Sequence, residues 1–306
     1  MSALTGQRHP HDRGGHRDEG LVEVNGTALY VTDTAARSAT PGPPLLLLHG
    51  WGADRRDWDR LAESLSDRHR VLTLDLRGHG RSPASPTSYS PFVLAADVAE
   101  LLRARLAEPA VLVGHSLGAL VVSIVAVEHP ATVAALLVVD PAYGRPAGHE
   151  GVVAPWVARL RAGDGDLAVA LVADSVDPDR APDLVAWLRS RVRATAPEVI
   201  WRTLADIHLG PDSISTEPAT RRYLANRACP VLALNRQADR AALEVSFLRG
   251  PLSRSLVWPD SGHFPHLEHP ARFERLVREW LSIVEGHGAG AFSFASDVVG
   301  APEPPR

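Results

Sequence analysis

Short, uninterrupted apolar runs alternate along this chain with segments of helical periodicity, and this alternation constrains the fold more than any other feature. Apolar runs of four or five residues are typical of strands buried on both faces; they lie at 45–48, 71–74, 110–113, 135–139, 231–234 and 255–258. Helical spacing marks residues 57–65, 91–106, 117–127 and 272–284. Repeated strand–helix units predict an α/β protein with a mostly parallel sheet and helices on both faces.

Two regions depart from this alternation. Asn25-Gly26 lies between two strand-like segments and predicts an antiparallel hairpin near the start of the chain. Between Asp140 and about Ala228 there is no convincing strand, and helical pieces occur instead at 153–161, 167–173, 182–194 and 197–207. We therefore expect a core formed by 21–140 and 229–285, with a helical cap at 141–228. The polar ends, 1–20 and 286–306, are expected to be disordered.

Composition excludes several classes of function. The formal net charge of −4 and the pI of about 6.4 give no electrostatic reason to expect nucleic acid or an anionic membrane surface as a partner. The single cysteine, Cys229, precludes an intrachain disulfide framework and a multi-cysteine metal site. No run approaches the ~18 apolar residues of a membrane span. We expect a cytoplasmic protein that acts on a small molecule without a metal or a cofactor, with a homodimer as one possible assembly.

The segment Gly114-His115-Ser116-Leu117-Gly118 carries the clearest chemical signal. A G-x-S-x-G pattern alone is weak, but this one directly follows an apolar strand and directly precedes an apolar helix. A sharp turn at that place holds a serine in a strained conformation, and small glycines let the strand and the helix approach closely. The hydroxyl then projects at the carboxyl edge of the sheet, beside a helix N-terminus. Ser116 is therefore the predicted nucleophile.

A serine hydroxyl needs a base, and His263 is the best candidate among fourteen histidines. It follows the last expected strand and precedes the last helix, so its loop should lie at the same sheet edge as Ser116. An oxyanion formed there needs two N–H donors. The backbone amide of Leu117 should supply one, and the amide of Trp51, in the loop after 45–48, should supply the other.

A substrate pocket is expected under the cap, where pockets are mostly apolar. The candidates that line it are His49, Gly50, Tyr143, Trp156, Trp187 and Trp201. The imidazole of His49 is expected to order its loop through hydrogen bonds, and the tryptophans of the cap are also natural core residues.

Five segments together resemble the α/β-hydrolase superfamily, in particular its capped members, which include esterases, epoxide hydrolases, haloalkane dehalogenases, C–C bond hydrolases and cofactor-free haloperoxidases. They follow the family's order and read LLLLHGWGADRRDW, LDLRGHGRS, VGHSLGA, LLVVDPAY and DSGHFPHLEHPARF. The resemblance implies an eight-stranded sheet with a helical cap between the sixth and seventh strands. Family members that form an alkyl-enzyme ester carry aspartate at the position of Ser116, so the resemblance disfavours dehalogenase and epoxide hydrolase chemistry and favours acyl transfer.

The resemblance also implies a triad acid between the serine and the histidine in the chain. Asp239 occupies the family's usual place after the seventh strand and is favoured. The turn before it, 235–238, lacks the glycine that is usual in the family. Asp140, which ends the strand at 135–139, is the alternative, because some relatives carry the acid after the sixth strand.

The leading hypothesis is a serine hydrolase that cleaves an ester, a lactone or a related carbonyl bond of a small to medium apolar substrate through an acyl-enzyme. Two alternatives remain open at this point. The same triad performs C–C cleavage, acyl transfer or cyclisation in biosynthetic enzymes, depending on whether water is excluded. A ligand-binding protein on a hydrolase scaffold is the other alternative, because a fold does not guarantee a function.

Overall fold

One eight-stranded sheet runs through the protein in the computed structural model, which describes residues 16–286, 294 and 297–299. A hairpin of β1 (Arg17–Val24) and β2 (Thr27–Thr34) turns at Asn25-Gly26, and β2 pairs antiparallel with β4 (Val71–Leu74). The other strands are parallel to β4 and follow the order β4-β3-β5-β6-β7-β8; they are β3 (Leu45–Leu48), β5 (Ala110–His115), β6 (Val133–Val139), β7 (Val231–Asn235) and β8 (Arg254–Val257). The predicted α/β-hydrolase fold is confirmed.

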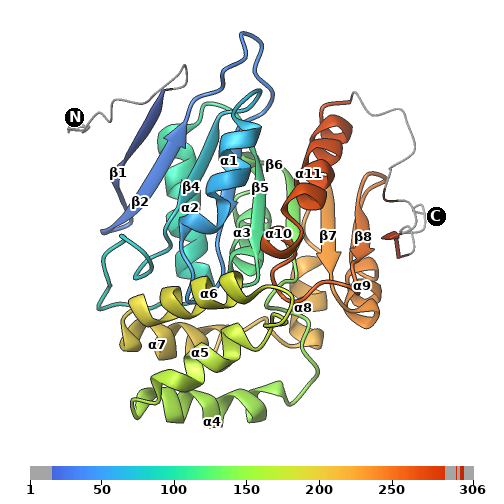
Figure 1. The fold of residues 1–306 in the computed structure, drawn as a ribbon. Helices are drawn as coiled ribbons and strands as arrows, with labels where there is room; N and C mark the ends of the chain where they lie inside the picture. The colour runs from blue at the N-terminus through green and yellow to red at the C-terminus, as the bar shows by residue number, and fades with distance from the viewer. Residues whose placement is uncertain (1–15, 287–293, 295–296, 300–306) are drawn as a thin grey trace.

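Helices cover both faces of this sheet (Figure 1). One face packs against α1 (Asp59–Leu65) and α11 (Pro270–Val284), and the other packs against α2 (Pro91–Arg105) and α3 (Leu117–Glu128). The run Leu45–Leu48 shows why the central strand segments are mostly apolar on both faces. Leu46 and Leu48 belong to the apolar cluster on the α3 side, whereas Leu45 and Leu47 belong to the cluster on the α11 side.

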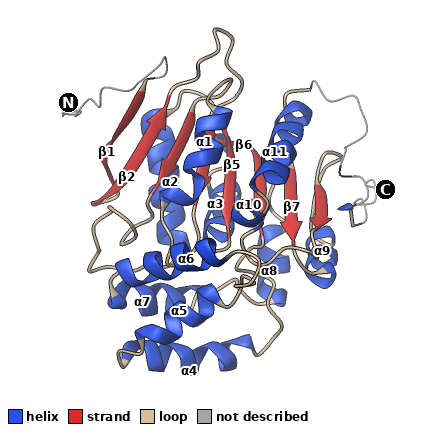
Figure 2. Cartoon of the chain, in the orientation of Figure 1, coloured by secondary structure: helices blue, strands red, loops and turns tan. Residues whose placement is uncertain are grey.

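The cap lies beyond the carboxyl ends of the strands and is entirely helical (Figure 2). It comprises α4 (His149–Arg161), α5 (Gly165–Ala173), α6 (Pro182–Ala194) and α7 (Pro197–His208), and it has its own apolar cluster. The next helix, α8 (Glu217–Leu224), packs against α3, and its Leu224 is fully buried in the core cluster. The expected cap at 141–228 therefore ends in a helix that packs on the core.

The residues near both ends of the chain that the structure describes are ordered, in contrast to the expectation. Strand β1 begins at Arg17, so the prediction of disorder is wrong for 17–20, and residues 1–15 lie outside the described residues. Near the other end, Phe294 is buried against Trp258, and Val298 forms a bridge with Leu256 of β8. The disorder prediction is wrong there too, whereas 287–293, 295–296 and 300–306 lie outside the described residues.

The sequence pattern also missed three short helices, α8, α9 (Ala238–Val245) and α10 (Pro265–Glu268). Helix α9 is the next element after β7 and α10 is the next element after β8, and both shape the site described below. Among the helices of the described part of the chain, none combines the length and apolar character needed to cross a membrane.

Candidate active site

Ser116 occupies a strained turn between β5 and α3. Its φ of 51° and ψ of −112° lie in a region that non-glycine residues rarely adopt. The turn is possible because the residues two positions before and after Ser116 are glycines. A Cβ on Gly118 would lie 2.3 Å from the Leu48 carbonyl oxygen, and one on Gly114 would lie 2.4 Å from the Gly118 carbonyl oxygen. The N–H of Ser116 donates to the carbonyl of Val139 at 2.9 Å, which ties the turn to β6.

His263 lies on the loop between β8 and α10 and contacts two other candidate residues. Its Nε2 is 3.0 Å from Ser116 Oγ, and its Nδ1 is 2.5 Å from Asp140 Oδ2. In the tautomer that satisfies both contacts, the Nδ1–H donates to the carboxylate and the serine hydroxyl donates to Nε2. The three residues follow the carboxyl ends of β5, β6 and β8 and form the geometry of a Ser-His-Asp triad.

The carboxylate beside His263 is Asp140, and the preference for Asp239 is wrong. Asp140 is buried at the end of β6, with a φ of 37°. Asp239 is exposed in the first turn of α9, where its carboxylate accepts a hydrogen bond from the N–H of Arg240. The reason is the local path of the chain: only Arg236 and Gln237 separate β7 from α9, so Asp239 lies on a helix and not on a loop that could reach His263.

Two arginines hold the Asp140 region, and the sequence analysis missed both. Arg236 Nε lies 3.3 Å from Asp140 Oδ2, and Arg240 donates to the carbonyls of Pro141, Tyr143 and Gly144 in the loop that follows the acid. Burial alone would raise the pKa of Asp140, but the hydrogen bond from His263 and the charges of His263 and Arg236 outweigh it and lower that pKa. The only sequence signal was the unusual turn at 235–238, where Arg236 stands.

The backbone of His263 is fixed from two sides. His115, which is buried, lies with Nε2 2.7 Å from the His263 carbonyl oxygen, so this nitrogen carries the hydrogen and donates. Burial, followed by the neighbouring His263 and His266, lowers the pKa of His115 well below its usual value, so its ring is neutral. From the cap, the carbonyl of Ser175 accepts the N–H of His263 at 3.1 Å. The backbone of His263 is therefore held by both the core and the cap.

The loop after β3 lies beside Ser116. A Cβ on Gly50 would lie 3.2 Å from Ser116 Cβ, which shows how closely the two backbones approach. His49 orders this loop: its Nδ1–H donates to the Gly50 carbonyl at 2.7 Å, and its Nε2 accepts the Leu76 N–H at 2.9 Å. Full burial lowers the pKa of His49 to about 3, which keeps the ring neutral. Within the described chain, the backbone N–H groups of Trp51 and Leu117 have no hydrogen-bond acceptor.

Several residues expected in the substrate pocket lie elsewhere. Tyr143 is fully buried in the core, where its ring packs in the apolar cluster. Its hydroxyl lies 3.3 Å from both Glu244 Oε1 and Arg227 Nη1, which form a buried ion pair. Trp187 is 36% exposed, and its indole lies 3.3 Å from Asp57 Oδ1 and stacks against Arg191. Trp156 and Trp201 pack against the apolar cluster of the cap.

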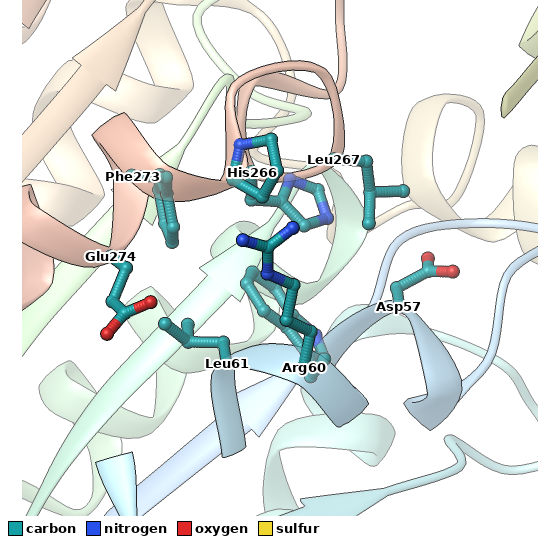
Figure 3. A pocket seen from close by; sticks show the side chains of 9 residues that line it. Asp57, Arg60, Leu61, His266, Leu267, Phe273 and Glu274 are labelled. Carbon is teal, nitrogen blue, oxygen red and sulfur yellow. The ribbon is translucent and has the colours of Figure 1, made fainter. Parts of the chain in front are cut away.

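One cavity lies beside the segment that follows His263 and not over Ser116. It has a volume of about 170 Å³ and lies between α1 and α10–α11, with Asp57, Arg60, His266, Phe273 and Glu274 among its lining residues (Figure 3). A second pocket of about 550 Å³ lies on the cap beside His208 and Glu150. No triad residue lines either pocket. In the described chain, no three His, Cys, Asp or Glu side chains gather in a group that could hold a metal ion.

Comparisons with known proteins agree with this geometry. A family model described as "Alpha/beta hydrolase family" matches residues 45–276. A pimeloyl-[acyl-carrier protein] methyl ester esterase from Aeromonas hydrophila subsp. hydrophila is 30% identical over 256 residues, which covers 78% of this chain and 96% of that protein. The sn-1-specific diacylglycerol lipase ABHD11 of Mus musculus is 29% identical over 264 residues, covering 78% and 81% of the two chains.

A solved structure gives the same fold. The thermophilic esterase from Thermogutta terrifontis aligns with a TM-score of 0.73 at 24% identity, over 88% of this chain and 99% of that one. The resemblance seen in the sequence motifs is therefore confirmed. This chain belongs to the alpha/beta hydrolase family, as a serine hydrolase with esterases among its relatives.

Proposed function

We propose that this protein hydrolyses carboxylic esters of small to medium size and apolar character, with Ser116, His263 and Asp140 as the catalytic triad. The observation that carries the proposal is the continuous hydrogen-bond path from Ser116 Oγ through the His263 ring to Asp140 Oδ2, at 3.0 and 2.5 Å. Such a path lets the imidazole take the serine proton while the carboxylate stabilises the imidazolium that forms.

The reaction follows from this arrangement in two halves. Ser116 Oγ attacks the ester carbonyl carbon as its proton passes to His263 Nε2, and the carbonyl oxygen becomes an oxyanion that accepts the free N–H groups of Trp51 and Leu117. Collapse of this intermediate breaks the bond to the alcohol, which leaves with the proton from His263. Water then attacks the acyl-enzyme by the same steps and releases the carboxylic acid.

An apolar substrate fits the surroundings of the triad. The apolar cluster of the cap reaches the site through Phe264, next to His263, and through Trp51, which packs against the same cluster. A cap of this kind favours alkyl or aryl groups on the substrate. The relatives act on a methyl ester and on a diacylglycerol, according to their names, and both substrates join an ester group to alkyl chains.

A panel of p-nitrophenyl esters from acetate to laurate, with methyl esters of the same acids, tests the proposal. We expect the wild-type protein to turn over the short and medium members, and the Ser116→Ala variant to lose this activity. Undiminished hydrolysis by Ser116→Ala, or no turnover of any member by folded wild-type protein, would contradict it. The cytoplasmic location and the homodimer stay predictions, and light scattering coupled to size exclusion measures the second directly.

A further inference from the structure

The turn that carries Trp51 is clamped between the core and the cap. It runs from Gly50 to Ala53 and is closed by the Ala53 N–H, which donates to the Gly50 carbonyl at 3.3 Å. On the core side, the hydrogen bonds of His49 hold it. On the cap side, the indole N–H of Trp51 donates to the Ile200 carbonyl of α7 at 2.9 Å. The oxyanion amide of the proposed site thus lies in a segment that the cap contacts directly.

A buried ion pair adds a further contact between the cap and this loop. The guanidinium of Arg191, on α6, contacts the Asp54 carboxylate, and the two side chains are only 3% and 7% exposed. Trp187 stacks on Arg191 with its ring 4.5 Å from the guanidinium carbon. Asp54 is itself fixed, because its carboxylate also accepts the Arg56 N–H at 2.9 Å and so caps the short helix Arg55–Trp58. Arg191 therefore contacts a rigid point three residues beyond Trp51.

Apolar packing next to the ion pair also joins the cap to the loop that carries Trp51. Gly52 has a φ of 67°, and a Cβ there would lie 3.2 Å from Val192 Cγ2 and 3.5 Å from Ile200 Cδ1. Val192 follows Arg191 on α6, so one turn of this helix supplies both the charged and the apolar contact. A shift of α6 would have to move the backbone from Gly52 to Asp54, because close-packed contacts leave no room for independent movement.

We propose that Arg191 is a positioning residue for the oxyanion hole: its ion pair with Asp54 fixes the loop that directs the Trp51 N–H at the reacting carbonyl oxygen. This inference rests on the proposed function and adds a residue of the cap to it. Preorganised donors stabilise a transition state only while their direction is held, and a displacement of about 1 Å is enough to lower a rate by about 100-fold.

The test removes both charges together, because Asp54→Asn alone would leave the buried Arg191 without a partner and endanger folding, whereas Asp54 also pairs with Arg56. The variant is Arg191→Met with Asp54→Asn, and the matched control is Arg193→Met, two positions along α6, where Arg193 is 61% exposed in a pair with Asp166. For each protein we would measure urea unfolding, kcat and KM on a p-nitrophenyl ester, and the inhibition constant of an alkyl trifluoromethyl ketone. That ketone adds to Ser116 and places an oxyanion in the hole.

For the double variant we expect cooperative unfolding, a KM within twofold of wild type, a kcat lowered about 10- to 100-fold, and an inhibition constant raised by a similar factor. Arg191→Lys, which keeps the charge, should recover part of the loss, and Arg193→Met should match wild type. A folded double variant with wild-type kcat and inhibition constant would overturn the inference. A double variant in which KM rises as much as kcat falls, together with a lower free energy of unfolding, would overturn it too, because such changes indicate a general structural role. If wild-type protein hydrolyses no ester, the proposed function itself fails.

Discussion

Arg236 and His263 share one oxygen of Asp140. The Arg236 Nε lies 3.3 Å from Asp140 Oδ2, and the His263 Nδ1 lies 2.5 Å from the same atom. The proposed triad acid therefore comes from the end of β6, while the loop after β7 contributes a cation that faces it. Asp140, at the end of β6, contacts His263, whereas Asp239, in the helix after β7, does not. The following substitutions test whether the two aspartates differ in their effect on activity.

Asp140→Asn should lower kcat about 100- to 10,000-fold, because an amide cannot hold His263 in the required tautomer or stabilise the imidazolium. Asp239→Asn should leave kcat within twofold of wild type, since the Asp239 carboxylate is exposed on α9. Steady-state kinetics on one p-nitrophenyl ester compares the two variants. A larger loss for Asp239→Asn than for Asp140→Asn would remove Asp140 from the triad.

Arg236→Gln should raise the pKa of Asp140, because it removes one of the charges that lower it. The side chain of Arg236 is 35% exposed, so solvent screens the effect, and we expect kcat/KM to fall only about two- to fivefold at pH 7. The ratio of variant to wild-type activity should fall further as the pH is lowered to 5. Arg221→Gln, which breaks an exposed pair on α8, is the control. A ratio that does not change with pH would show that Arg236 has no electrostatic effect on the acid.

Gly118→Ala should destabilise the protein by about 3 kcal/mol or more, because its Cβ would lie 2.3 Å from the backbone oxygen of Leu48, which cannot yield. Gly151→Ala serves as the opposite control. Gly151 lies within α4 with no atom within 4 Å of an added Cβ, so alanine there should stabilise the protein by about 0.5–1 kcal/mol. Urea unfolding measures both changes. Equal stabilities of the two variants would contradict the close approach of α3 to β3.

Asp57→Asn should change how stability depends on pH. Burial raises the pKa of Asp57 from its usual 3.8 to about 7, so the folded protein binds a proton there that the unfolded chain has already lost. This contribution to stability is complete below about pH 3.8 and is lost as the pH rises through 7. Between pH 5 and 8 the wild-type protein should lose at most about 3 kcal/mol that Asp57→Asn does not lose.

The amide of Asp57→Asn keeps an acceptor for the Trp187 indole, so the comparison isolates the charge. Asp239→Asn, at an exposed position, should follow the wild-type pH dependence. The prediction is wrong if the stabilities of wild type and Asp57→Asn run parallel from pH 5 to pH 8.

Sequence patterns predicted the parts of the molecule that depend on neighbouring residues. The apolar runs placed β3 and β4 at the residues that form them, since a strand buried on both faces is predominantly apolar. Chain order also placed Ser116 and His263 at one edge of the sheet, where they lie 3.0 Å apart. Both inferences need only the local pattern and the rule that parallel strands end at the same edge.

Features that depend on the path of a loop were missed. The choice between Asp140 and Asp239 depends on whether the residues after β7 form a loop or begin a helix, and only two residues separate the strand from α9. The ion pair of Arg191 and Asp54 joins residues far apart in the chain, and although Asp54 stands in the segment LLLLHGWGADRRDW, no local pattern indicates Arg191 as its partner. Phe294 lies in a segment rich in glycine and alanine, yet its ring is buried against Trp258.

Mass spectrometry after treatment with a fluorophosphonate tests the central claim most directly, when it is applied to wild type, Ser116→Ala and His263→Ala. The activated hydroxyl of Ser116 should attack phosphorus and displace fluoride, which gives one adduct on the peptide that contains Ser116. We expect this single adduct in wild type and its loss in both variants. An adduct that persists in Ser116→Ala, or its absence from folded wild-type protein, would contradict the assignment of Ser116 as the nucleophile.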